Sequence, residues 1–290
     1  VQQNAFEEKD VTVGSGEWAL PGMLTLPTGS GPFPAVVLVH GSGPNDRDET
    51  IGPNKVFKDL AWGLASRGVA VLRYDKRTYA YAAKFDERAV KSLTVQGEVI
   101  DDALAALQLL LNREEIDPQR VFLLGHSLGA TLAPRIALQN NEIAGLILLA
   151  GTTRPLEDIT LEQVEYLANL DEEVSREEQN QIQTLKTQVA RVKSLNLTTD
   201  SAASDMPLNI PPAYWLDLRE YNPAETASAL TVPMLVLQGE RDYQVTMSNY
   251  AGWQQALSRR ENVSFKSYPS LNHLFISGTG LPNPQEYNTA

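Results

Sequence analysis

Apolar residues along the chain alternate between short continuous runs and helical spacing. The run at 35–39 has the length and continuity typical of a strand buried on both faces of a parallel sheet. Further strands are predicted at 69–74, 121–124, 143–149, 234–237 and 263–268, with a turn at Asp117-Pro118. Helical spacing predicts helices at 56–65, 95–111, 128–139 and 246–257. This alternation predicts an α/β fold, in which helices flank a mostly parallel, twisted sheet.

Two parts of the chain depart from the alternation. Near the N-terminus, β-forming residues at 10–13 and 18–26 flank a Gly-Ser-Gly sequence and predict a hairpin. Later, residues 155–194 are polar and charged with helical spacing, and 196–212 are irregular. This gap between two predicted strands is too long for an ordinary crossover. We therefore expect a helical lid at 152–213, inserted into an α/β core made of 1–151 and 214–290.

Composition excludes several classes of protein. The 290 residues are 42% hydrophobic and 21% charged, which is typical of a globular protein, and no apolar run reaches the length of a membrane span. The formal net charge of −12 argues against binding to nucleic acid or to an anionic membrane surface. The absence of cysteine excludes disulfides and a thiol nucleophile, and the presence of only three histidines argues against a histidine-rich metal site.

The strongest local motif is the pentapeptide at 125–129, Gly-His-Ser-Leu-Gly. A strand is predicted directly before it and a helix directly after it, and this context distinguishes a nucleophile elbow from an ordinary Gly-Ser turn. The glycines leave room for a sharp turn with Ser127 at its apex. Ser127 is therefore the predicted nucleophile.

A serine hydroxyl needs a base, and three histidines are available. His126 lies inside the elbow and is expected to point away from Ser127 into packing, whereas His40 is expected to brace a loop. His273 alone follows Ser127 in the chain, as the order Ser, Asp/Glu, His of an elbow-type site requires. For the orienting acid, Glu240 and Asp242 both follow the predicted strand at 234–237, and we prefer Asp242 because Glu240 directly follows a turn glycine.

The reaction also needs two amides that face the developing negative charge. One is expected from Leu128, directly after the nucleophile. The other is expected from the glycine-rich loop after the first buried strand, with Ser42 as first choice and Gly41 as second.

These landmarks, in this order and spacing, resemble the α/β-hydrolase superfamily. The segments at 40–48 and 72–77 more narrowly resemble a group of bacterial carboxylesterases. The sequence departs from many superfamily members at 77–81, where Arg-Gly-x-Gly is replaced by a bulkier segment. Asp75 and Arg77 are interpreted as a structural pair that braces a loop.

The resemblance implies a serine hydrolase that cleaves small, short-acyl carboxylic esters through an acyl-enzyme, without metal or cofactor. A serine peptidase or amidase with the same triad, and a non-catalytic binding protein of this fold, are the alternatives. The expected partner is a small ester, with no nucleic acid or membrane, and the chain is expected to be a monomer or a homodimer. The compartment stays open between the cytoplasm and export with removal of an N-terminal segment.

Substrate choice is expected to depend on the lid. Ordinary packing is the alternative for every residue proposed to line the pocket. These residues are Tyr166, Leu167, Met206, Tyr214 and Trp215. The charged run at 46–48 lies close to the predicted oxyanion loop and is either a solvated loop or a recognition element.

Overall fold

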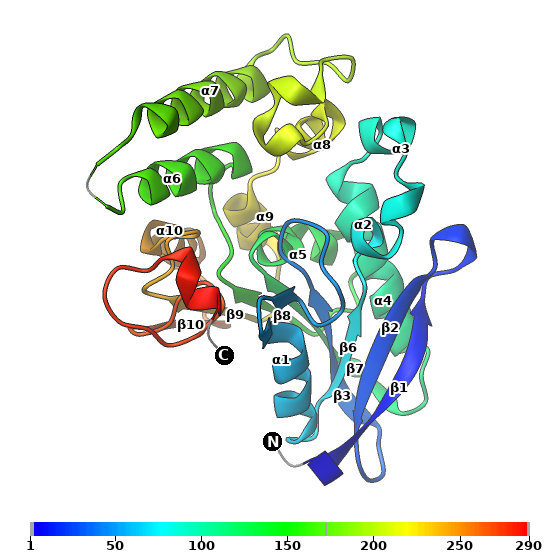
Figure 1. The fold of residues 1–290 in the computed structure, drawn as a ribbon. Helices are drawn as coiled ribbons and strands as arrows, with labels where there is room; N and C mark the ends of the chain where they lie inside the picture. Colours follow the sequence, from blue (N-terminus) through cyan, green and yellow to red (C-terminus); the bar gives the residue numbers. More distant parts are fainter. Residues whose placement is uncertain (1–2, 172, 289–290) are drawn as a thin grey trace.

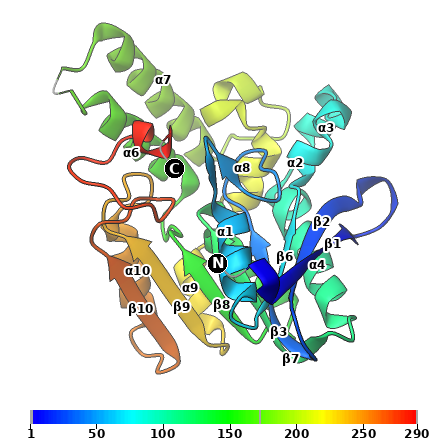
Figure 2. The same cartoon turned by 60° about the horizontal axis from the view of Figure 1, so that its bottom comes forward.

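The computed structural model describes residues 3–171 and 173–288. Its centre is an eight-stranded sheet with the order β1-β2-β6-β3-β7-β8-β9-β10 (Figures 1 and 2). These strands are β1 (Phe6–Val13), β2 (Leu20–Pro27), β3 (Phe33–Val39), β6 (Ala70–Tyr74), β7 (Ile116–His126), β8 (Gly145–Leu149), β9 (Met234–Gly239) and β10 (Val263–Tyr268). A separate two-stranded ribbon pairs β4 (Thr50–Ile51) with β5 (Asn54–Lys55).

The predicted mostly parallel sheet is confirmed. β1 and β2 form the antiparallel hairpin expected at the N-terminus, β2 pairs antiparallel with β6, and the strands from β6 to β10 pair in parallel. The turn predicted at Asp117-Pro118 is wrong, because both residues lie within β7. The pairing with β3 jumps there from Ile116 to Val121, so the segment bulges out of the sheet pairing.

Helices cover both faces of the sheet. On one face α1 (Val56–Ala65) packs against alternate side chains of β3, β6, β7 and β8. The other face carries the larger core, to which α4 (Asp101–Leu111), α5 (Leu128–Gln139), α9 (Pro223–Ala229) and α10 (Met247–Leu257) contribute. The continuous apolar runs of the central strands follow from this burial on both sides.

The helix predicted at 95–111 begins differently from the prediction. Gln96–Ile100 forms a π-helical turn, and α4 continues from it. Two short helices that the pattern did not predict, α2 (Arg77–Ala80) and α3 (Glu87–Lys91), lie between β6 and this turn.

The long segment between β8 and β9 is largely helical. It contains α6 (Leu156–Ala168), α7 (Arg176–Lys193) and α8 (Pro212–Leu218) before α9 returns to pack on α5 and α10. Figure 1 shows α6, α7 and α8 together beyond the end of the sheet. The predicted boundary between 213 and 214 falls inside α8. The role of this segment as a lid remains a prediction.

In the part of the chain that the structure describes, no helix combines the length and apolarity needed to cross a membrane.

Candidate active site

Ser127 lies at the sharp turn between β7 and α5. Its φ of 53° and ψ of −115° place a residue with a side chain in the left-handed half of backbone space, which is strained. The packing explains why glycines flank it. A Cβ on Gly125 would lie 2.2 Å from the carbonyl of Gly129, and a Cβ on Gly129 would lie 2.1 Å from the carbonyl oxygen of Val39. The turn therefore has the close approach of helix to sheet that an elbow requires.

His273 and Asp242 meet in a buried hydrogen bond. His273 Nδ1 lies 2.6 Å from Asp242 Oδ2, and both side chains are almost fully buried. The carboxylate is held in place because its Oδ1 accepts the amides of Gln244 and Val245, each at 2.8 Å. Gln238 Nε2 donates to Oδ2 at 3.1 Å. This arrangement fixes the orientation of the imidazole.

The other acid considered for this position lies elsewhere. Glu240 is exposed and accepts a hydrogen bond from Ser267 Oγ at 2.7 Å. The structure therefore brings Asp242, and not Glu240, to the histidine.

His126 has a different environment from the packing that the sequence predicted. Its Nε2 donates to the carbonyl of His273 at 3.0 Å, and the two imidazole rings lie 4.8 Å apart. Its Nδ1 lies 3.1 Å from a carboxylate oxygen of the buried Glu49. Because Nε2 must carry a proton to donate, and Nδ1 faces a carboxylate, the geometry favours an imidazolium that forms an ion pair with Glu49.

The pKa values of this pair agree with the geometry. Burial has the largest single effect on each group and opposes its ionisation, but the nearby charges and hydrogen bonds together outweigh burial. The pKa of Glu49 is lowered and the pKa of His126 is raised. Sequence reasoning missed Glu49. The only signal was its position directly after the charged run at 46–48, which follows the glycine-rich loop.

The glycine-rich loop after β3 lies directly against the elbow. A Cβ on Gly41 would stand 3.2 Å from Ser127 Cβ. The amide of Gly41 donates to Glu49 Oε1 at 2.7 Å, and its carbonyl accepts Lys76 Nζ at 3.0 Å. Among the hydrogen bonds of residues 3–171 and 173–288, none has the amide of Ser42 or of Leu128 as donor. The amide of Gly41 is thus engaged, which favours Ser42 over Gly41 as an oxyanion donor.

His40 braces this loop, as expected. Its Nε2 lies 3.0 Å from the carbonyl of Asp46, and burial lowers the pKa of His40 to about 4, so the ring is neutral at pH 7. The charged run is not a solvated loop. Arg47 holds both carboxylate oxygens of Asp75, and Asp48 pairs with the buried Arg73.

The interpretation of Asp75 and Arg77 as partners is wrong. Asp75 pairs with Arg47, whereas Arg77 pairs with Asp102 on α4. Each residue still braces a loop, but it does so through a partner from another element.

The residues predicted to line a substrate pocket lie in three places. Tyr166 and Leu167 on α6 pack beside Tyr243 and Leu274, which follow Asp242 and His273 in the chain. Tyr214 on α8 is buried, and its hydroxyl donates to Glu98 at 2.8 Å. Met206 and Trp215 are fully buried in a small core of the helical segment. Only the first group lies next to the loops that carry Asp242 and His273.

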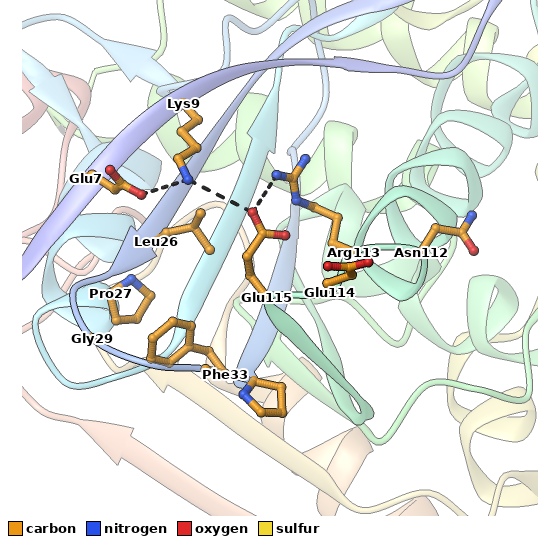
Figure 3. Close-up of a pocket in the computed structure, with 12 residues that line it drawn as sticks. Glu7, Lys9, Leu26, Pro27, Gly29, Phe33, Asn112, Arg113, Glu114 and Glu115 are labelled. Carbon is orange, nitrogen blue, oxygen red and sulfur yellow. Dashed lines mark hydrogen bonds and ion pairs between the residues drawn. The ribbon is translucent and has the colours of Figure 1, made fainter.

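A hollow of about 760 Å³ lies at the opposite edge of the sheet, near the amino ends of β3 and β7. Figure 3 shows that its charged side chains face one another. Lys9 contacts Glu7 and Glu115, and Arg113 contacts Glu115. Its lining contains none of Ser127, Asp242 and His273, so it is separate from the candidate active site. In residues 3–171 and 173–288, no three His, Asp or Glu side chains are grouped as metal ligands.

The sheet order, the strained serine after β7 and the carboxylate–histidine pair after β9 and β10 define a protein of the α/β-hydrolase fold. The chain belongs to the family described as serine aminopeptidase, S33, whose model matches residues 31–278. The expected resemblance to this superfamily is confirmed.

One curated relative is esterase EstD of Thermotoga maritima, which is 47% identical over 287 residues. The match covers 99% of this chain and 64% of EstD, so the chain spans just under two thirds of that relative. The expected similarity to a bacterial esterase group is thereby confirmed.

Two solved structures show the same fold at low sequence identity. An acylaminoacyl peptidase in complex with Z-Gly-Gly-Phe-chloromethyl ketone has a TM-score of 0.61 and 19% identity, over 93% of this chain and 38% of that chain. An esterase of Pyrococcus furiosus has a TM-score of 0.60 and 18% identity, over 94% of this chain and 85% of that chain.

Proposed function

We propose that this chain is a serine carboxylesterase that hydrolyses small, short-acyl esters through an acyl-enzyme. The observation that carries the proposal is the buried hydrogen bond between His273 and Asp242, on a loop that adjoins the elbow of Ser127 through His126. The 47% identity to an esterase supports an ester as the substrate class.

In the proposed mechanism, Ser127 Oγ attacks the ester carbonyl while His273 Nε2 accepts its proton. Asp242 holds Nδ1 and stabilises the imidazolium that forms. The amides of Ser42 and Leu128 bind the oxyanion of the tetrahedral intermediate. His273 then protonates the leaving alcohol, and a water molecule, activated by the same histidine, hydrolyses the acyl-enzyme.

A peptidase or amidase is the second candidate, because the family description names an aminopeptidase. The same triad serves both reactions, since neither the sheet nor the triad determines the leaving group.

A paired assay separates the two candidates. We expect p-nitrophenyl esters, from acetyl to dodecanoyl, to be turned over faster than aminoacyl-anilides, with the highest kcat/KM at short acyl lengths. A fluorophosphonate is expected to label the wild type but not Ser127→Ala. If anilides were turned over faster than esters, the esterase proposal would be wrong and the peptidase proposal would take its place. Absence of both turnover and labelling in the folded wild type would refute a serine hydrolase of either kind.

A further inference from the structure

The peptide bond between Gly41 and Ser42 carries both a carbonyl held by a buried cation and the amide proposed for the oxyanion hole. Lys76 Nζ lies 3.0 Å from the carbonyl oxygen of Gly41, and the lysine is only 2% exposed. A buried ammonium is costly unless it is paired, and the mechanism above does not use it. We propose that Lys76 is a positioning residue that orients and polarises the Gly41–Ser42 peptide, so that the amide of Ser42 serves as an oxyanion donor.

Peptide geometry links the lysine to the amide. The Gly41–Ser42 peptide is trans, so its carbonyl and its N–H point in opposite directions within one rigid plane. An ammonium that fixes the carbonyl therefore fixes the direction of the N–H as well. A charged donor on the carbonyl also polarises the peptide and strengthens its N–H as a donor.

The loop is held from its other side too. The amide of Gly41 is bound by Glu49, and the backbone amide of Lys76 donates to the carbonyl of Asn45 at 3.0 Å. Rotation of the Gly41–Ser42 peptide would break the contact with Lys76 while these bonds hold its neighbours. Asn45 Nδ2 donates to the same Gly41 carbonyl at 3.2 Å, so Lys76 is the charged one of two side chains that act on this peptide itself.

Lys76 is held in turn by Glu98, on the π-helical turn before α4. Glu98 Oε2 lies 3.6 Å from Lys76 Nζ, and Thr78 Oγ1 donates to Glu98 Oε1 at 2.8 Å. The hydroxyl of Tyr214 on α8 donates to Glu98 Oε2 at 2.8 Å. Tyr214, Glu98 and Lys76 therefore form a buried polar chain that joins the helical segment to the oxyanion loop.

This arrangement has a consequence for the helical segment. Part of it contacts the catalytic machinery through Tyr214, so displacement of α8 would loosen Glu98 and Lys76. We expect Tyr214→Phe, which removes only the hydroxyl, to lower kcat by roughly threefold to tenfold, less than loss of the lysine, because the ion pair remains.

The inference rests on the proposed function, and its test uses Lys76→Met, which keeps most of the side-chain volume. Lys58→Met is the matched control, because Lys58 is a half-buried lysine on α1 whose ammonium lies over the ring of Trp62. Because Lys76→Met leaves Glu98 buried without its cation, the double variant Lys76→Met/Glu98→Gln removes both charges. The glutamine oxygen can accept from one of Thr78 and Tyr214, while its NH2 group can donate to the hydroxyl oxygen of the other. Thermal melting establishes that each variant is folded.

We expect these variants to lose stabilisation of the transition state and to keep their affinity for the bound substrate. For the double variant we expect kcat to fall roughly 10- to 100-fold with KM within about threefold of wild type, since loss of a whole oxyanion donor costs about 10²–10³. Affinity for a trifluoromethyl ketone, which forms an oxyanion adduct with the serine, should fall by a similar factor. Lys58→Met should match wild type in both measurements.

A folded double variant with kcat and ketone affinity within threefold of wild type would overturn the role of Lys76. A rise in KM alone would do the same. Failure of the proposed function looks different, because the wild type itself would then hydrolyse no ester. Ketone affinity would still test Lys76 in that case, since it requires only addition of Ser127 to a carbonyl.

Discussion

At the scale of single residues, Ser127 is distinguished by strained backbone and close contact with Gly41. Alanine can occupy the same backbone conformation and removes only the hydroxyl. We therefore expect Ser127→Ala to keep the fold and to lower kcat/KM for a p-nitrophenyl ester by about 10³-fold or more. Activity above a tenth of wild type, in a preparation free of other esterases, would refute the assignment of the nucleophile.

The two acids after β9 provide a matched pair of substitutions. Asp242 is buried against His273, whereas Glu240 is exposed and bonded to Ser267. Asp242→Asn should leave the imidazole in the wrong tautomer, for which a loss of about 10⁴ in kcat is typical, and Glu240→Gln should stay close to wild type. If steady-state kinetics showed Glu240→Gln to be the more damaged variant, the choice of acid would be wrong.

At the scale of elements, the elbow depends on how closely α5 approaches the sheet. A Cβ on Gly129 would lie 2.1 Å from the carbonyl oxygen of Val39, so Gly129→Ala must displace the start of α5. We expect a loss of stability of at least about 1–3 kcal/mol, as overpacking costs, together with a fall in kcat.

Gly63→Ala on α1 is the control, because the nearest atom to its Cβ is 3.9 Å away on the flexible side chain of Arg67. Replacing a helical glycine that has open space around it by alanine raises the stability of the protein by about 0.5–1 kcal/mol. Urea unfolding of both variants tests the contrast. Equal stability of the two would mean that α5 does not need the close approach.

The helical segment between β8 and β9 offers a second contrast. From sequence, Tyr166 and Trp215 have the same predicted role in the substrate pocket, but their surroundings differ. Tyr166 is half-buried and stacks on Tyr243 beside Asp242, with ring centroids 5.2 Å apart. Trp215 is fully buried with Val192 and Met206.

We therefore expect Tyr166→Ala to shift acyl-length preference by up to about 100-fold, within the 1–3 kcal/mol of a pocket contact. Trp215→Ala should chiefly destabilise the protein, by roughly 3–5 kcal/mol. An ester panel and thermal melting on both variants measure the two effects. If Tyr166→Ala left the acyl preference unchanged, we would conclude that α6 does not line the substrate pocket.

At the scale of the whole molecule, the sequence predicted what is encoded locally. The strand runs, the helix at 128–139 and the glycines around Ser127 carry their signal within a few residues, and chain order selected His273 and Asp242. The contacts of Glu49 with His126, and of Lys76 with Glu98 and Tyr214, join residues far apart in the chain. A charged residue in a loop has the same local sequence whether it is solvated or buried, so these pairs follow only from the tertiary structure.

The pair of Glu49 and His126 connects the oxyanion loop, the elbow and the histidine loop, and so should affect the stability of the whole edge of the sheet. The pKa of Glu49 lies below its ordinary value of 4.5, so its contribution is complete above pH 4.5 and is lost as the pH falls through the folded value. The pKa of His126 lies above 6.5, so its contribution is complete below pH 6.5 and is lost as the pH rises through the folded value. Both contributions are therefore complete only between these two ordinary values.

The difference in melting temperature between wild type and Glu49→Gln should be greatest between pH 4.5 and 6.5 and should shrink on both sides. Glu240→Gln, which also removes one carboxylate, controls for the change in net charge, and the nearby Asp242, His273 and His40 are the same in all three proteins. A difference of the same size below pH 4.5, between pH 4.5 and 6.5, and above pH 6.5 would mean that the charges on Glu49 and His126 do not stabilise the folded protein. A difference that shrinks below pH 4.5 but stays at its full size above pH 6.5 would mean that Glu49 stabilises the loop through the amide of Gly41 alone, and the imidazolium would then have no part in holding the three loops together.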